Sequence, residues 1–234
     1  MQAIDTSTPS LARAYDFLLG GRANFAADRA MAGRMQDMYP RARTLLSLSR
    51  TFRATAATSL ARGGVSQFID VGCGLPTAPA THEAALSARR EARVVYVDRD
   101  PAVVSHAAAL LPAVRPPALV RVIEGDLAEP EALLWSLRPL LDLSRPACLV
   151  LALVVQALPD AGLARAVVDV LVRGLAPGSC LIMTAGHGDD GRLPDGVTGA
   201  SLAERDFESF FAGLDLLPPG VEAGLVLRGT GRKP

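Results

Sequence analysis

Five short apolar segments, separated by stretches of helical periodicity, constrain the fold of this chain more than any other feature of its sequence. The segments are rich in β-branched residues, and each has about the length of one strand. We expect strands at residues 67–70, 93–98, 119–124, 147–155 and 180–184. Helical stretches fit between them, at residues 81–88, 101–111, 132–141 and 160–175. Strands that alternate with helices predict βαβ units, and hence an α/β fold with a mostly parallel sheet.

The two ends of the chain differ from this repeating pattern. Residues 10–62 have helical periodicity, with a break at Gly20-Gly21 and a new helix beginning at Pro40. We therefore expect a helical cap at residues 1–62 and an α/β core at residues 63–234. At the other end we expect a helix at residues 201–211, and a hairpin of residues 214–217 and 224–227 at the sheet edge.

Composition excludes several classes of protein. The 234 residues are 50% hydrophobic, which suits one domain with a sizeable core. Lys plus Arg and Asp plus Glu both number 24, so no basic excess favours a nucleic-acid partner. The three cysteines are widely spaced, which predicts neither a disulfide framework nor a zinc site, so we expect no metal. No targeting or membrane-spanning segment is expected, and these features favour a cytoplasmic location; a homodimer is left open.

Three acidic residues follow the first three predicted strands. Asp70, Asp98 and Asp126 are spaced 28 residues apart, about one βα unit each. In open α/β sheets, ligands bind outside the carboxyl ends of the strands, so the three carboxylates are expected on one rim. The alternative for each is a turn or helix-capping role.

A glycine-rich loop follows the first strand, with the sequence Asp70-Val71-Gly72-Cys73-Gly74. A dinucleotide fingerprint would have a third glycine where Thr77 stands, so a bound diphosphate is not favoured. Asp98 is placed to accept hydrogen bonds from ribose hydroxyls, and Asp126 to meet a base edge. The acidic rim therefore favours a nucleoside ligand without phosphates that carries positive charge.

Together these residues resemble a class I S-adenosylmethionine-dependent methyltransferase. More narrowly, the chain is similar to an actinobacterial S-adenosyl methyltransferase family, formerly a domain of unknown function. The motifs that carry this similarity are Pro9-Ser10-x-Ala12-Arg13-x-Tyr15-Asp16-x-Leu18-Leu19-Gly20-Gly21, Asn24-Phe25-x-x-Asp28-Arg29, Gly72-x-Gly74-Leu75-Pro76-Thr77, Val97-Asp98-x-Asp100-Pro101 and Leu175-x-Pro177-Gly178-Ser179.

The resemblance implies a Rossmann-like fold with a seven-stranded sheet, helices on both faces and S-adenosylmethionine over the strand ends. Gly72 and Gly74 would face the methionine part of the cofactor, and Asp98 would hold the ribose. Asp126 and Leu127 would contact the adenine. Of the residues near the methionine end, Asp70 would orient the loop and reach the amino group, Tyr15 would cover the cofactor or pack in the core, and Arg13 or Arg50 would pair with the carboxylate.

The chain departs from the family pattern where the catalytic base is usually found. A histidine that relatives carry after the fourth strand is replaced by Gln156, which cannot act as a base. His187 is displaced relative to a Ser-His pair of relatives, and is either the base or a solvated loop residue. The glycine-rich segment at residues 186–200 is expected to be a lid or a surface connection.

Two functions are compatible with these observations. The first is methyl transfer from S-adenosylmethionine to an oxygen, nitrogen or carbon atom of a small secondary metabolite, which releases S-adenosylhomocysteine. The second is a methyltransferase-like enzyme that binds the cofactor and catalyses a cyclisation or another reaction without methyl transfer. A small-molecule substrate is expected in either case.

Overall fold

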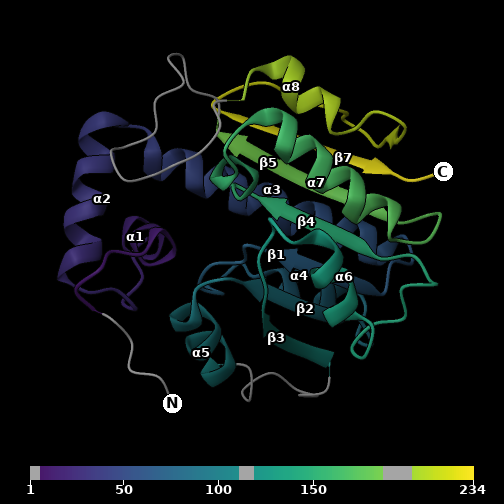
Figure 1. Ribbon diagram of the computed structural model, residues 1–234, viewed down its shortest axis with the longest axis horizontal. Coiled ribbons are helices and arrows are strands. Elements are labelled where there is room, and N and C mark those ends of the chain that lie inside the picture. Colours follow the sequence, from purple (N-terminus) through teal and green to yellow (C-terminus); the bar gives the residue numbers. More distant parts are fainter. Residues whose placement is uncertain (1–5, 111–118, 187–201) are drawn as a thin grey trace.

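The structure, a computed structural model, describes residues 6–110, 119–186 and 202–234. Its centre is a seven-stranded sheet with the strand order β3-β2-β1-β4-β5-β7-β6 (Figure 1). The first five strands are parallel, β7 is antiparallel to β5, and β6 is antiparallel to β7. The predicted α/β fold with a mostly parallel seven-stranded sheet is confirmed. The strands are β1 (Gln67–Val71), β2 (Arg93–Asp98), β3 (Val120–Glu124), β4 (Cys148–Ala152), β5 (Cys180–Gly186), β6 (Asp215–Leu216) and β7 (Val226–Arg232).

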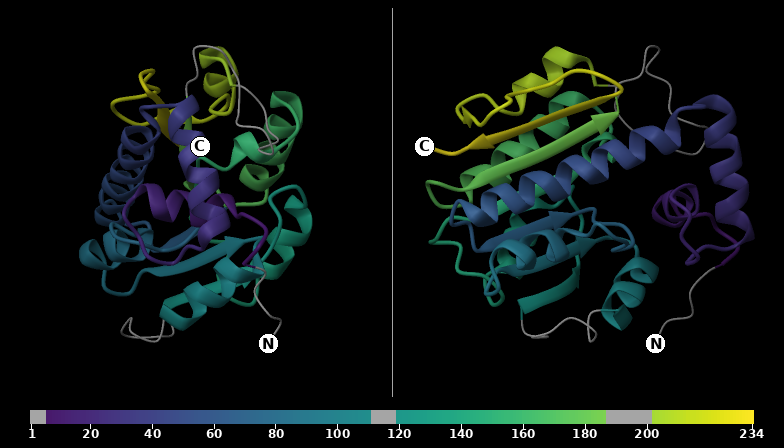
Figure 2. Two further views of the ribbon diagram at one scale, coloured as in Figure 1. Left: turned by 90° about the vertical axis from the view of Figure 1, so that its left-hand side faces the viewer. Right: turned by 180° about the vertical axis from the view of Figure 1, so that it is seen from behind.

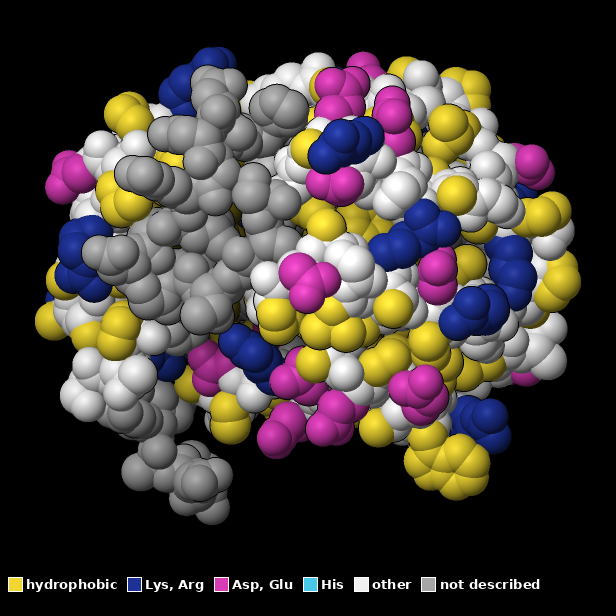
Figure 3. All heavy atoms as spheres, turned by 45° about the horizontal axis from the view of Figure 1, so that its top comes forward, with side chains coloured by type: hydrophobic (Ala, Val, Ile, Leu, Met, Phe, Trp, Pro, Cys, Tyr) yellow, Lys and Arg dark blue, Asp and Glu magenta, His cyan; other side chains and the backbone are white. Residues whose placement is uncertain are grey.

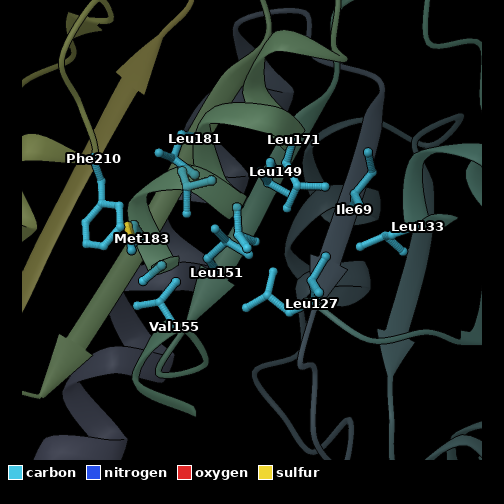
Figure 4. Packing of buried hydrophobic residues seen from close by; sticks show 14 of the residues in the cluster. Ile69, Leu127, Leu133, Leu149, Leu151, Val155, Leu171, Leu181, Met183 and Phe210 are labelled. Atoms are coloured by element: carbon cyan, nitrogen blue, oxygen red, sulfur yellow. The ribbon is translucent and has the colours of Figure 1, made fainter. Parts of the chain in front are cut away.

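Helices cover both faces of the sheet, because successive side chains of each buried strand point to opposite faces. Ile69 and Val95 pack toward α6, α7 and α8, whereas Phe68 and Tyr96 pack toward α3 and α4. Figure 4 shows part of the first of these two cores, with Leu149 and other side chains of the central strands. The helices of the core are α4 (Thr81–Ala88), α5 (Pro101–Leu110), α6 (Pro130–Leu137), α7 (Ala161–Arg173) and α8 (Glu204–Ser209).

Three helices precede the first strand, with a break at Gly20-Gly21 as predicted. They are α1 (Leu11–Leu18), α2 (Ala26–Met38) and α3 (Ala42–Arg62). The long α3 lies along one face of the sheet, and α1 and α2 lie beyond one end of it (Figure 2). Ala57 and Leu60 of α3 are buried in the same core as Phe68 of β1, so α3 is part of the sheet's packing.

Most elements differ from their predicted bounds by a few residues, and two differ in a way that affects the fold. The fourth strand, expected to reach residue 155, ends at Ala152, because Leu153 takes a left-handed conformation with φ of 57° and the chain then enters a 3-10 turn, η3 (Val155–Ala157). The predicted hairpin is wrong in its pairing, because β6 pairs with Gly231 and Arg232 at the far end of β7. The chain end is thus an internal strand of the sheet.

Charged side chains of both signs are interspersed on the face shown in Figure 3, where neither sign dominates. No helix in the described part of the chain is long and apolar enough to cross a lipid bilayer.

Candidate active site

A cavity of about 1090 Å³ opens at the carboxyl ends of β1 to β4. Its walls come from the glycine loop after β1, the segments after β2, β3 and β4, and the N-terminal helices. Besides Arg50, seven of the predicted site residues line it, which is the outcome expected when parallel strands end on one rim. They are Arg13, Tyr15, Gly72, Gly74, Asp98, Asp126 and Leu127.

The glycine loop has a backbone that other residues would not adopt easily. Gly72 and Gly74 have φ of 65° and 59°, in the left-handed region. A Cβ atom at Gly72 would also lie 2.1 Å from Cγ2 of Val154, so this position tolerates no side chain. At Gly74 a Cβ would meet little besides Ala12 at 3.8 Å, which leaves the backbone open to the cavity.

Asp98 at the end of β2 holds this loop in place. Its Oδ2 accepts a hydrogen bond from the Gly74 amide at 2.9 Å, and its Oδ1 accepts one from the Asp100 amide at 3.0 Å. Burial raises the pKa of the Asp98 carboxyl, although the backbone hydrogen bonds oppose that shift. The carboxylate therefore lies on the cavity wall with its geometry already fixed, as a ligand-binding group requires.

The segment after β3 forms the next part of the rim. Asp126 is half-buried, accepts a hydrogen bond from the Ala128 amide at 2.9 Å, and lies 4.0 Å from the Arg99 guanidinium. Leu127 is buried and belongs to the sheet core, yet it also lines the cavity. A carboxylate that can accept hydrogen bonds, placed beside an apolar wall, suits a purine base.

Asp70 does not line the cavity but lies behind the glycine loop. It is 1% exposed, accepts a hydrogen bond from the Thr81 hydroxyl at 2.5 Å, and lies 3.6 Å from the Arg53 guanidinium. Burial raises its pKa, whereas Arg53 and Thr81 lower it. Its Oδ1 is buried and has no hydrogen-bond partner among the described residues. In this structure Arg53, and not Asp70, reaches the cavity.

Arg13 is occupied by contacts within the protein. Its Nε lies 2.8 Å from Oδ2 of Asp28, its Nη2 donates to the Thr8 carbonyl, and its Nη1 lies 3.9 Å from Asp100. Asp28, which is fully buried, also accepts hydrogen bonds from the amides of Ser10 and Phe25 at 2.8 Å. Burial alone would raise the pKa of Asp28, but these hydrogen bonds and Arg13 hold it below its usual value. The Arg13–Asp28 pair thus fixes α1 against α2.

Asp16 is a structural residue that sequence reasoning did not assign. Its Oδ2 accepts hydrogen bonds from the Ala23 amide and the Asn24 side chain, which closes the turn after α1. A Cβ at Gly21 would lie 1.9 Å from Asp16 Oδ1. Asp16, Gly21 and Asn24 all belong to the motifs that carry the family resemblance, and that was the feature of the sequence that could have indicated this role.

Arg50 of α3 lines the cavity and is oriented by a hydrogen bond to the Thr77 hydroxyl of the glycine loop. Burial and the nearby Arg53 lower its pKa to about 10, so the guanidinium stays charged at neutral pH. Among the described residues it forms no salt bridge within 4.0 Å. A half-buried guanidinium without a carboxylate within salt-bridge distance is a ready site for an anionic ligand group.

Of the two predicted catalytic residues, only Gln156 is among those that the structure describes. Gln156 belongs to η3 and does not line the cavity; its amide lies against Gly186 at the end of β5. His187 and the segment after Gly186 lie outside the described residues. Three residues close to Gln156 in sequence line the cavity instead; they are Leu153, Val154 and Ala157.

Comparisons with known proteins agree with this geometry. A family model described as S-adenosyl methyltransferase matches residues 1–229. A crystal structure from Thermobifida fusca, provisionally assigned as a methyltransferase, is 35% identical with a TM-score of 0.87, over 98% of this chain and 96% of that one. A DUF574 family protein from Streptomyces avermitilis is 30% identical with a TM-score of 0.90, over 99% of this chain and 100% of that one.

More distant structures share the fold. The N-methyltransferase NodS from Bradyrhizobium japonicum, crystallised with S-adenosylhomocysteine, is 19% identical over 78% of this chain and 86% of that one, with a TM-score of 0.56. No curated protein matches the chain.

Proposed function

Because the chain belongs to the S-adenosyl methyltransferase family, we propose that it transfers a methyl group from S-adenosylmethionine to a small molecule of secondary metabolism. The acceptor atom would be oxygen, nitrogen or carbon, and S-adenosylhomocysteine would be released. Structures that share only the fold include a mitomycin 7-O-methyltransferase and an amino pentose methyltransferase of calicheamicin biosynthesis. Their named roles support a small-molecule substrate, in preference to a nucleic acid.

S-adenosylmethionine is the cofactor of this family, and the cavity suits it. When bound, the cofactor supplies a methyl group that its sulfonium charge already activates. We assign Asp98 to the ribose hydroxyls, Gly72 and Gly74 to the methionine part, and Asp126 with Leu127 to the adenine. The observation that carries this proposal is Asp98, a carboxylate fixed by the Gly74 amide on the wall of an open cavity.

The charged ends of the methionine part need their own partners. We assign its carboxylate to Arg50, since Arg13 is already paired with Asp28. We assign Asp70 a positioning role through Thr81 and Arg53, which extends the earlier expectation that it orients the loop. In this proposal residues 1–62 act as a cap over the cofactor, with Tyr15 on its inner wall, and residues 63–234 form the binding core.

The chemical demand on the protein is small. Methyl transfer is an in-line displacement, so the protein mainly orients the acceptor and excludes water. Tyr15 is a poor candidate for a base, because burial raises its pKa to about 12 and keeps the hydroxyl protonated. Gln156 and His187 remain the predicted catalytic positions, although Gln156 cannot act as a base and does not line the cavity. We place the reaction in the cytoplasm, where the three free and buried cysteines stay reduced.

Calorimetric titration of S-adenosylmethionine tests the cofactor site. We expect Asp98→Ala to weaken binding about tenfold to a hundredfold, since hydrogen bonds to a charged group are lost. Asp142 is an exposed carboxylate at the opposite edge of the sheet, beside the first residue of β1. It provides the matched control: Asp142→Ala should bind S-adenosylmethionine as the parent does. Equal binding by Asp98→Ala would refute the assignment.

The two candidate functions separate on the product. We would incubate the protein with donor labelled in its methyl group and with metabolite fractions, and measure both S-adenosylhomocysteine and label in the acceptor. Methyl transfer predicts both in equal amounts. Conversion of a metabolite without S-adenosylhomocysteine would favour the non-methylating enzyme instead.

A further inference from the structure

The strand order fixes the direction in which the cofactor crosses the rim. Asp126 follows β3, Asp98 follows β2 and Gly72 follows β1, and these three strands are successive neighbours in the sheet. A ligand held by all three, as the proposed function requires, extends across the rim from β3 to β1. The next strand is β4, so the reacting end of the cofactor faces the segment that follows β4.

One group of apolar side chains lines the cavity at this end. We call it the acceptor chamber, and it brings together α1, α2, α3 and the left-handed turn after β4. Its residues either belong to one apolar cluster of the N-terminal helices or pack directly against it. They are Tyr15, Leu19, Met31, Leu46 and Leu153.

The charged groups of the cavity are arranged around the chamber and not inside it. The carboxylates that line the cavity lie at or just after the ends of β2 and β3, where the nucleoside part is proposed to bind; they are Asp98, Asp100, Glu124 and Asp126. Arg13 and Arg53 are paired with Asp28 and Asp70. Arg50 is turned toward Thr77 of the glycine loop. Across the described residues, the acceptor chamber therefore presents no carboxylate.

The N-terminal helices carry a further carboxylate, that of Asp16 in α1. Asp16 is adjacent to Tyr15 in sequence, but it is 2% exposed. Its Oδ2 bonds to Ala23 and Asn24, and its Oδ1 is buried without a hydrogen-bond partner among the described residues. It does not line the cavity. The hydroxyl groups of Tyr15 and Ser49 are then the neutral polar groups that the described wall offers near this end, and Ser49 is already bonded to Thr184 at 2.7 Å.

From this arrangement we infer that the acceptor is an apolar molecule that reacts through an uncharged hydroxyl group, and that protonated amines are excluded. An ammonium group would lose its hydration in a chamber whose described wall has no carboxylate, and it would meet the positive charge of the sulfonium. It would also have no free lone pair with which to attack. A hydroxyl group has such a lone pair and is cheaper to desolvate.

The bonds of the transfer balance without a further co-reactant. A lone pair of the acceptor oxygen forms the new oxygen–carbon bond, while the sulfur–methyl bond breaks and its electron pair stays on sulfur. The hydroxyl proton passes to water at the cavity mouth. The products are a methyl ether, S-adenosylhomocysteine and a proton. The cavity volume of about 1090 Å³ reaches the upper end of the range of single-ligand pockets, which is consistent with room for an acceptor beside the cofactor.

Two probes of nearly equal shape test the inference on the intact protein saturated with S-adenosylhomocysteine. They are 1-naphthol, which is neutral at pH 7, and 1-naphthylmethylamine, which is a cation. We expect calorimetry to give binding of the naphthol and at least about tenfold weaker binding of the amine, because an unpaired charge is buried. Equal or tighter binding of the amine, or binding of neither probe, would overturn the inference.

A charge introduced into the chamber sharpens the test. Leu19 lines the cavity at the end of α1 and is only partly buried, so substitution there is tolerable. We expect Leu19→Glu to shift the probe preference toward the amine by about tenfold, whereas Leu19→Gln, which is polar but uncharged, leaves the preference unchanged. Leu48→Glu, at an exposed site of α3 outside the cavity, is the control for added charge.

The outcomes distinguish this inference from the proposed function. A protein that fails to bind S-adenosylhomocysteine would refute both. A protein that binds S-adenosylhomocysteine and also prefers the amine, or whose preference Leu19→Glu does not move, would refute the inference about the acceptor and leave the proposed function standing.

Discussion

At the scale of single residues, the rim of the cavity is formed by glycines and carboxylates at or just after the ends of parallel strands. Asp98, Gly72, Gly74, Asp126 and Leu127 all line the cavity as expected. The structure pairs Arg13 with Asp28 and places Asp70 behind the glycine loop beside Arg53. Which carboxylate pairs with which guanidinium depends on residues far apart in sequence, and the sequence contains no signal for that choice.

Gly72→Ala tests the most constrained of these positions. The added methyl group would meet Val154 at 2.1 Å and the backbone has φ of 65°, so we expect a loss of about 1–3 kcal/mol of stability and of most cofactor affinity. Gly33→Ala in α2, where a Cβ meets nothing within 4 Å, is expected to gain about 0.5–1 kcal/mol. Thermal unfolding and calorimetric titration of both variants provide the comparison, and a neutral Gly72→Ala would contradict the geometry.

Two ligands, one with and one without a carboxylate, test the role of Arg50 in binding and separate it from the structural role of Arg13. Arg50→Gln should weaken S-adenosylmethionine binding about tenfold but leave 5′-methylthioadenosine unaffected, since the latter lacks the carboxylate. Arg13→Gln should instead cost about 3–5 kcal/mol of stability, because Asp28 would remain buried without its partner. If Arg50→Gln weakened both ligands equally, its assignment to the carboxylate would be wrong.

At the scale of elements, periodicity located the helices and strands but not their ends. β4 stops at Ala152 because the left-handed Leu153 turns the chain toward the cavity, and no glycine marks that turn. The last strand was expected to be short, yet β7 runs beside β5 for seven paired residues. Such pairing is decided by the neighbouring strand and not by local sequence.

The junction of α1 and α2 should make stability depend on pH. The pKa of Asp28 is lowered in the folded protein, so its carboxylate contributes stability that is fully present above its unfolded pKa of about 3.9. That contribution is lost as the pH falls through the folded pKa. We expect Asp28→Asn to be less stable than the parent at pH 7 and the difference to shrink below pH 4. Urea unfolding between pH 3 and pH 7 measures it, and a constant difference would argue against the charged pair.

The chain's single lysine fixes the end of α7. Lys233 Nζ donates to the carbonyls of Val172, Arg173 and Leu175 at 2.6–3.2 Å. Because a cation at a helix C-terminus binds the last carbonyls and is favoured by the dipole, Lys233→Met should cost about 1 kcal/mol. Chemical denaturation of this variant, with Arg232→Met as a neighbouring control, would reveal the effect; equal stabilities would rule it out.

At the scale of the whole molecule, the two segments expected from the sequence share one core. Ala57 and Leu60 of α3 pack with Phe68 and Val94 of the sheet. We therefore expect a single cooperative unfolding transition by scanning calorimetry, and a fragment of residues 63–234 that does not fold alone. Two separate transitions would show that residues 1–62 fold as an independent unit.

The hydroxyl of Ser10, at the start of α1, donates to Asp100 at 2.6 Å, and the amide of Asp100 donates to Asp98. We therefore expect binding of the ribose at its proposed site, Asp98, to be coupled through Asp100 to the docking of α1. Because linkage is reciprocal, we expect a change that weakens the docking of α1 to weaken nucleoside binding as well. We therefore expect the fluorescence of a dye attached at Ser7, close to α1, to change when the cofactor binds. This measurement needs no knowledge of the substrate.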